Sequence, residues 1–228
     1  MKHTKLVFII ITLFIFEKNY SQSIYNNQLL KTYEDKIKER EEAKILNLQG
    51  SSYIDENYVE AEIFNVEEVA QIRYDAFLDE MDVKTEEGSR YLKKELNTLI
   101  TFIKEDKVYT VSNYDDVGVT KTGYFVVLVR DDAKKLSLLV QEKIILKEEV
   151  KPKTNYDKYK PPTLKRLKDK IFVSLNNNPA MELSIRKKEI LNIFSSKSKI
   201  VEKFAKENKL SFKKQEDLTK IFSYYNTL

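Results

Sequence analysis

Apolar and polar residues alternate most regularly along residues 71–84. Up to Leu78 one face carries Ile72, Tyr74, Ala76 and Leu78 at even-numbered positions, with Arg73, Asp75 and Phe77 opposite, but the next two apolar residues, Met81 and Val83, occupy odd-numbered positions. A β-strand has a period of two, so this change of parity indicates a bulge or tight turn within the segment. We therefore expect two strand pieces with a kink at Asp79.

Short strand signals follow one another through the middle of the chain, separated by charged, turn-like stretches without a long helical insert. This order favours antiparallel hairpins over a parallel α/β sheet. For residues 51–150 we expect an antiparallel β meander or a partly closed barrel. The predicted strands are 59–63, 98–103, 107–112, 124–129, 136–140 and one from Ile144 onward; the predicted turns are 104–106, 114–118 and 130–135.

Two polar segments flank this β domain. Residues 22–50 carry many charges and only a thin apolar stripe, which predicts an N-terminal helical or flexible arm with a solvated surface. Residues 151–162 have almost no aliphatic side chain, and all four prolines lie between Pro152 and Pro179. We expect a Pro/Lys/Tyr-rich linker over residues 151–169.

The last segment, residues 170–228, predicts a β-hairpin followed by helices, which makes the fold class α+β. Two apolar runs, 170–175 and 180–185, flank an Asn-rich turn ending in Pro179. Three helical patterns follow, and the last places apolar residues at helical spacing along one face. The expected signals are a cap at Ser184, a break at Ser195 and Ser196, a stop at Asn208, and a packed face of Leu218, Ile221, Phe222 and Tyr225.

The N-terminus has the pattern of a signal peptide. Two lysines among the first five residues precede an apolar run from Leu6 to Phe16, which is too short to span a bilayer. We expect residues 1–21 to be removed after Ser21, and the alternative is an uncleaved anchor. No later hydrophobic run is long enough for an integral membrane segment, so the mature chain is expected in the periplasm or at the cell surface.

Composition narrows the chemistry available to the exported chain. The sequence has no Cys, no Trp and one histidine, His3, which lies in the expected signal peptide. Catalysis by Ser-His-Asp or Cys-His groups is thereby excluded for the mature protein, as are imidazole or thiolate metal sites, and we expect no cofactor and no metal. Cleavage also lowers the net charge of +4 by two, so the nearly balanced surface does not indicate a nucleic-acid partner.

Three segments, 50–58, 72–83 and 200–228, resemble an uncharacterised family of exported proteins of Bacteroidota. Ser52 stands where that pattern has Pro, and Asp75 stands where it has Asn. The resemblance implies export and a similar architecture. It implies no activity, because the family has none assigned.

The candidate ligand-binding residues are Arg73, Asp75, Asp79 and Glu80, with Asp82 in the same acidic cluster. Paired carboxylates can hydrolyse glycosidic bonds, and carboxylate oxygens can hold Ca²⁺, although the Gly and alternating Asp/Asn of a calcium loop are absent. The alternative is that Arg73 and nearby lysines pair with these acids on a solvated strand face.

The function expected from these observations is that of an exported, non-enzymatic envelope or periplasmic protein. It would act as a macromolecule-binding or structural module, with an envelope protein or glycan as its partner. Among the fourteen tyrosines, Tyr156 and Tyr159 lie in the basic linker, where they could stack on a ligand. The alternatives are a carboxylate-dependent polysaccharide hydrolase and a carrier of a small ligand or lipid.

Overall fold

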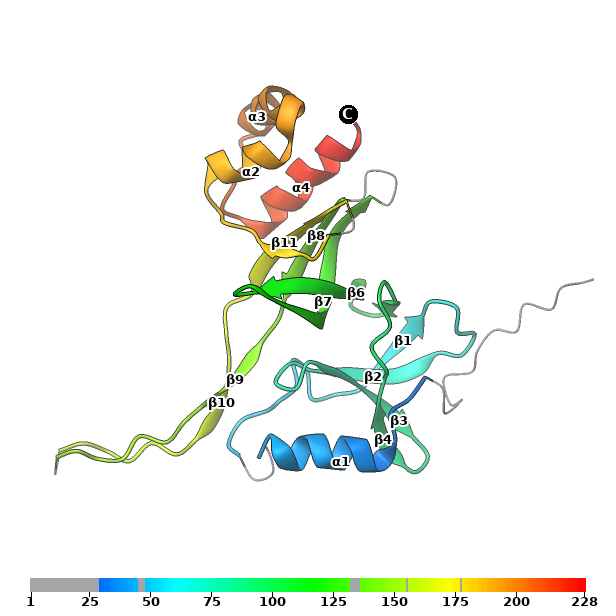
Figure 1. Ribbon diagram of the computed structural model, residues 1–228, viewed down its shortest axis with the longest axis vertical. Coiled ribbons are helices and arrows are strands. Elements are labelled where there is room, and N and C mark those ends of the chain that lie inside the picture. Colours follow the sequence, from blue (N-terminus) through cyan, green and yellow to red (C-terminus); the bar gives the residue numbers. More distant parts are fainter. Residues whose placement is uncertain (1–28, 45–47, 132–135, 155, 177) are drawn as a thin grey trace, which may run out of the picture.

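The computed structural model describes residues 29–44, 48–131, 136–154, 156–176 and 178–228, and shows an α+β fold (Figure 1). Within these residues a large antiparallel sheet curls into a half-barrel, with helices at its two ends and a small two-stranded sheet beside it. The predicted fold class is confirmed. The expected signal peptide, residues 22–28 of the expected N-terminal helical or flexible segment and most of the 130–135 turn lie outside the described residues.

The large sheet has the strand order β12-β11-β8-β7-β6-β5-β1-β2-β3-β4, and all its described pairings are antiparallel. Because β1 lies between β2 and β5, the chain builds the sheet outward in two directions from its first strand. The strands are β1 Val59–Ile63, β2 Ala70–Asp75, β3 Glu80–Thr85, β4 Gly88–Tyr91, β5 Leu99–Phe102, β6 Lys107–Asp116, β7 Val119–Asp131, β8 Leu136–Gln141, β11 Lys170–Leu175 and β12 Met181–Glu182.

The kink predicted at Asp79 is the turn of the β2–β3 hairpin. Asp79 has a φ of 59°, and the Asp75 carboxylate accepts a hydrogen bond from the Leu78 N–H at 3.1 Å, which closes the turn. The change of parity therefore marks a reversal of the chain. Because the reversal keeps the apolar residues of both strands on one face, Ile72 and Val83 pair on the core side.

Two large apolar cores lie along the sheet, and a smaller cluster of four buried residues, Phe125, Leu139, Phe172 and Ala180, involves strands β7, β8 and β11. The first fills the curl formed by β1 to β7 and contains three ring-packed tyrosines, Tyr74, Tyr109 and Tyr124. The second lies between the C-terminal helices and the β7–β8–β11 end of the sheet. Strand β7 contributes to both, through Tyr124 to the first and Val129 to the second.

The C-terminal helices are α2 Lys187–Ile193, α3 Ser198–Glu207 and α4 Gln215–Asn226. The expected break is confirmed by Ser195, whose φ is 47°, and the expected stop by Asn208, the C-cap of α3. The predicted cap at Ser184 is wrong, since α2 begins after Arg186 and has no side-chain cap. The packed face of α4 is confirmed by its buried Leu218, Ile221 and Phe222.

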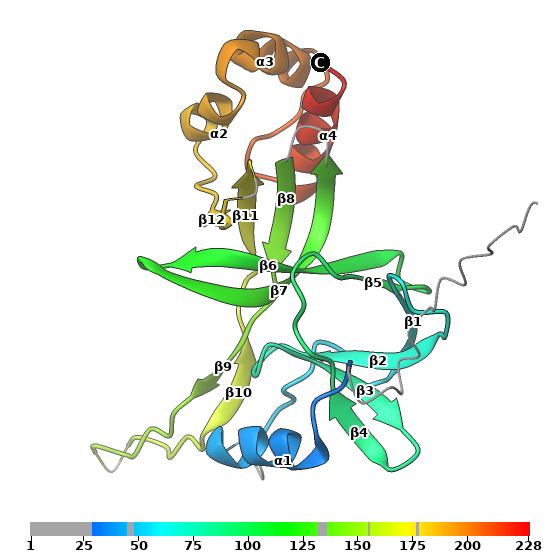
Figure 2. The ribbon, with the colours of Figure 1, turned by 45° about the vertical axis from the view of Figure 1, so that its right-hand side comes forward.

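Part of the expected linker forms a second, two-stranded sheet. Strand β10, Thr163–Arg166, pairs antiparallel with β9, Ile144–Lys147. Farther out, Val150 and Lys160 exchange two backbone hydrogen bonds of 2.9 and 3.0 Å. The chain thus runs out and back as a two-stranded projection, which both views show extending away from the body (Figures 1 and 2). We call residues 144–166 the arm.

Helix α1, Tyr33–Glu42, covers the outer face of the β2–β3–β4 end of the sheet (Figure 1). The Thr32 side chain accepts from the Asp35 N–H, and Asp35 accepts from the Thr32 N–H, so a capping box fixes where the helix begins. The helical alternative for this segment is confirmed at residues 33–42. Its fully solvated surface is not, because Lys36 is buried against the sheet.

Candidate functional site

The β2–β3 hairpin brings the acidic cluster onto one face of the sheet. In its register Arg73 lies opposite Asp82 and Asp75 lies opposite Glu80, on the side facing away from the apolar core. The expectation of a solvated face is wrong: Asp75 and Asp82 are 0% exposed and Glu80 is 6% exposed. Helix α1 and the polar segment around Ser52 cover them, so these carboxylates need partners inside the protein.

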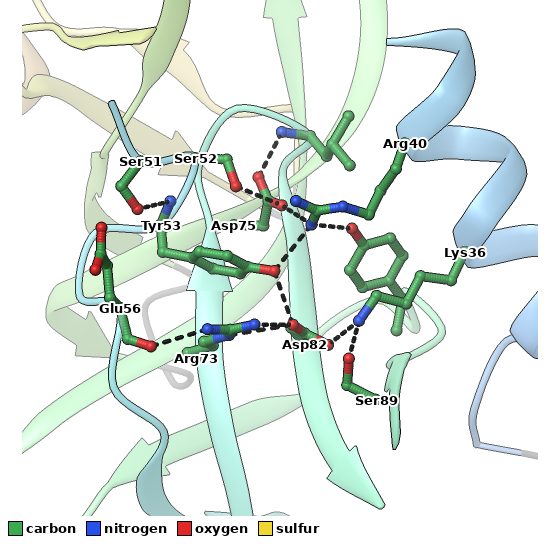
Figure 3. Close-up of polar contacts among 12 residues, drawn as sticks. Lys36, Arg40, Ser51, Ser52, Tyr53, Glu56, Arg73, Asp75, Asp82 and Ser89 are labelled. Carbon is green, nitrogen blue, oxygen red and sulfur yellow. Dashed lines mark hydrogen bonds and ion pairs between the residues drawn. The ribbon is translucent and has the colours of Figure 1, made fainter. Parts of the chain in front are cut away.

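Asp82 is the centre of this arrangement (Figure 3). One carboxylate oxygen accepts from the Lys36 ammonium of α1 at 2.5 Å. The other accepts from the Arg73 guanidinium at 3.0 and 3.1 Å, and from the hydroxyls of Tyr53 at 2.9 Å and Tyr58 at 3.1 Å. Two cations and two hydroxyls therefore satisfy one buried charge.

Arg40, one helical turn after Lys36, holds the second buried carboxylate. Its Nη1 donates to Asp75 at 3.2 Å, to the Tyr53 hydroxyl at 2.9 Å and to the Tyr91 hydroxyl at 3.3 Å. Asp75 also accepts from the Ser52 hydroxyl at 3.0 Å. We call Lys36, Arg40, Tyr53, Arg73, Asp75 and Asp82 the ionic cluster.

The other two candidate residues lie in a neighbouring set of contacts. Glu80 accepts from the ammonium groups of Lys31 at 2.9 Å and Lys94 at 3.0 Å, both through the same oxygen. Asp79 pairs with Lys94 at 3.2 Å and accepts from the Tyr74 hydroxyl at 2.7 Å and the Tyr124 N–H at 3.1 Å. The four candidates are thus divided between two groups around different cations.

The sequence identified Arg73, but the other two cations of the site, Lys36 and Arg40, were missed. Lys36 and Arg40 are spaced i, i+4 and so share one face of α1, but charged residues at this spacing usually face solvent. The signal that could have revealed them is the thin apolar stripe of this segment, because a helix with so few apolar residues must pack on the sheet through its charged ones. Tyr53 and Tyr58 lie in a segment without regular periodicity, so no pattern placed them beside Asp82.

Burial and charge move the pKa values of these groups in opposite directions. Burial by itself would raise the pKa of Asp82, but Lys36, the Tyr53 hydroxyl and Arg73 outweigh it and hold that pKa below the ordinary value. Burial lowers the pKa of Lys36, and Asp82 only partly opposes this. For Asp75, Asp79 and Glu80 burial is the larger effect, and the pKa of each is raised.

A cleft of about 480 Å³ lies between α1 and the sheet, beside the ionic cluster. We call it the α1 cleft. Asp75 and Asp82 are absent from its wall, whereas the side chains that hydrogen-bond them, Arg40, Arg73 and Tyr53, line it. Its lining residues are Tyr33, Lys36, Ile37, Arg40, Glu41, Tyr53, Arg73, Gly88 and Ser89.

Cations and tyrosine rings dominate this wall. The Arg73 guanidinium lies 3.7 Å from the Tyr53 ring centre and 4.2 Å from that of Tyr58, so its plane is fixed between the two rings. Nη1 makes every hydrogen bond that links the Arg40 guanidinium to the described residues, which leaves Nε and Nη2 as available donors. Such a surface suits an anionic group.

No family model matches the chain, and no curated protein or solved structure matches it either. In the described part of the chain, no helix is long and apolar enough to cross a membrane. The same residues contain no group of three or more Asp, Glu, His or Cys placed to hold a metal ion.

Proposed function

We propose that this protein is an exported, non-enzymatic binding module of the cell envelope, which holds a carboxylate-bearing glycan in the α1 cleft. The signal-peptide pattern of residues 1–21 and the resemblance to exported proteins of Bacteroidota support the location. The glycan is the partner class that fits a wall combining guanidinium groups with the exposed ring of Tyr33 and the half-buried ring of Tyr53.

The observation that carries the proposal is the order of the layers at the cleft. The carboxylates of Asp75 and Asp82 lie innermost, cations cover them, and the cleft, which Glu41 also lines, lies outermost. Arg40 retains donors for a carboxylate, and the ring of Tyr33, 47% exposed at the rim, offers a stacking face. A ligand carboxylate would approach cations already oriented by buried acids, so little ordering is needed on binding.

The same order of layers favours binding over hydrolysis. A glycosidase needs two carboxyl groups that reach the scissile bond from an open cleft. Asp75 and Asp82 are fully buried, and each is held by cations and hydroxyls of the protein. The carrier alternative needs strands closed around a cavity, whereas the described sheet is open and ends at β12 and β4.

Calorimetric titration of the full chain with oligogalacturonates, and with the same oligomers after reduction of their carboxylates, tests the proposal. We expect heat from the acidic oligomers only. Tyr33→Ala removes the exposed ring without opening the core, and should weaken binding roughly three- to tenfold. Lys38→Ala is the matched control on the solvent face of α1, where the lysine side chain is 74% exposed and pairs with Glu42.

Three results would count against this function. Equal binding of the reduced oligomers would show that the cations of the cleft do not recognise a ligand carboxylate. Equal losses in Tyr33→Ala and Lys38→Ala would place the ligand outside the α1 cleft. Release of new reducing ends during the titration would put the hydrolase alternative ahead.

A further inference from the structure

The arm ends in a basic and aromatic tip that contributes to neither core. Every described residue from 147 to 154 and from 156 to 160 is exposed. Tyr156 is 97% exposed, Tyr159 53% and Val150 46%. Exposed rings gathered at the end of a projection mark an interaction surface, since they gain nothing from the fold.

The tip is nevertheless ordered by its own contacts. Asp157 accepts hydrogen bonds from the Lys153 N–H at 3.1 Å, the Thr154 N–H at 2.9 Å and the Thr154 hydroxyl at 3.0 Å. The backbone hydrogen bonds between Val150 and Lys160 hold the outgoing and returning segments of the arm together behind this turn. The tyrosines are therefore presented on a hairpin with a defined turn.

Positive charge is concentrated at this end of the molecule. Four lysines lie within the tip, together with the carboxylate of Asp157, which is occupied by the turn; they are Lys151, Lys153, Lys158 and Lys160. Directly behind the tip, Glu149 pairs with Lys151 at 3.2 Å and accepts from the Tyr159 hydroxyl at 3.1 Å. The arm runs for about ten residues from the body, roughly 33 Å at the rise of a strand. Charges of the nearly balanced body are screened over about 8 Å, so an approaching surface meets the end of the arm, where the four lysines outnumber Glu149 and Asp157.

We propose that the arm tip, residues 150–154 and 156–160, adsorbs to an anionic lipid surface. Lysine ammonium groups attract the phosphates of anionic headgroups, and tyrosine rings settle at the level between headgroup and acyl chain. The slender projection carries the tip away from α1 and the rest of the body, so the tip can meet a lipid surface before they do (Figure 2). The tip thus holds the protein at a membrane, which is a role separate from glycan binding.

The chain has no tryptophan, so a single introduced one reports on its own position. We would compare Tyr156→Trp with Phe64→Trp, a control at another aromatic position, 65% exposed and on a loop next to β1. Both full-length variants are mixed with vesicles of phosphatidylcholine alone, or of phosphatidylcholine and phosphatidylglycerol in equal parts, with and without brominated acyl chains. We expect a blue shift and bromine quenching only for Tyr156→Trp with the anionic vesicles.

Replacing the four lysines by glutamine in the Tyr156→Trp chain should weaken this response at least about tenfold. The proposal is overturned if both tryptophans are quenched equally, or if neutral vesicles act as well as anionic ones. It is also overturned, in favour of a polyanionic glycan, if soluble dextran sulfate shifts the tryptophan emission of the Tyr156→Trp chain while brominated lipid does not quench it. An absence of any response rejects the tip as a binding surface.

Discussion

At the scale of single residues, the buried acids of this site differ in how completely their carboxylate oxygens are hydrogen-bonded. Both oxygens of Asp82 have cationic partners, and hydroxyls complete the set. Glu80 has two lysines on one oxygen, while its other oxygen is buried without a hydrogen-bond partner. A buried polar atom left unpaired costs free energy, so the two acids should respond differently to loss of charge.

Asp82→Asn should lower the free energy of unfolding at pH 7 by about 3–5 kcal/mol, because Lys36 would remain buried without its counter-charge. Glu80→Gln, the matched control on the same strand, should cost much less, since burial already disfavours the charged form of Glu80. Urea denaturation of both variants and the parent measures the difference.

The pH dependence of the two losses should run in opposite directions. The pKa of Asp82 is depressed, so its contribution is present above the ordinary value of 3.8 and is lost as the pH falls through the lower folded-state value. The pKa of Glu80 is raised above 4.5, so acidification through the raised value stabilises the parent but not Glu80→Gln. Parallel trends in the two variants would contradict this assignment of pKa directions.

At the scale of elements, α1 shows why part of the structure could not be predicted from the sequence. Strand β1 has apolar residues at a period of two, β7 and β8 contain short apolar runs, and α4 has apolar residues at helical spacing, so the local pattern was enough to predict them. Helix α1 buries only Lys36 within its own length, and a sequence pattern cannot tell a lysine paired with Asp82 from one in water. Lys36 and Arg40 were missed as site residues for the same reason.

Two strands were missed because pairing, not pattern, creates them. Strand β4 is Gly-Ser-Arg-Tyr, with Tyr91 as its only buried side chain, and it follows a tight turn after β3. Strand β10 is Thr-Leu-Lys-Arg, with one aliphatic residue, and follows two prolines that indicated a linker. Both become strands by completing the hydrogen-bonding edge of a neighbour that the sequence did reveal.

The contact between the β2–β3 turn and β7 depends on a glycine. A Cβ at Gly123 would lie 2.9 Å from the Asp79 carboxylate and 3.1 Å from the Tyr114 ring. Asp79 cannot move aside freely, since Tyr74 and the backbone of Tyr124 hold it. Gly123→Ala should therefore lower the free energy of unfolding by about 1–3 kcal/mol, measured in urea.

A double-mutant cycle separates this clash from a general effect on β7. In Asp79→Gly the carboxylate is gone, and glycine suits the positive φ of the turn. Adding Gly123→Ala in that background should cost clearly less than it does in the parent. An unchanged cost would show that Asp79 is not what limits the space at Gly123.

At the scale of the whole molecule, the continuous sheet joins the two cores. Strands β6, β7 and β8 pair along their lengths, and β7 places side chains in both cores. Because β7 forms part of both cores, separating this strand from one core also disrupts the other. The described chain should consequently unfold as one cooperative unit, although its sequence suggested separate β and C-terminal domains.

Phe222→Ala tests this coupling from the helical end. Phe222 is fully buried and its ring lies 4.9 Å from that of Phe194, so the substitution should cost about 3–5 kcal/mol. Ile72→Ala, in the other core, should cost about 2–5 kcal/mol. Each should shift the same single transition, followed by circular dichroism and by tyrosine fluorescence; a transition that splits in only one variant would show independent units.

The attachment of α1 through charges has a consequence for temperature. Hydrophobic contacts carry a large heat capacity and weaken on cooling, as those of α2–α4 must. Helix α1 hides little apolar area, and the cost of removing its Lys36–Asp82 pair from water falls as the temperature rises. Cooling therefore weakens the packing of the C-terminal helices more than it weakens the attachment of α1, whereas warmth favours the closed wall of the α1 cleft.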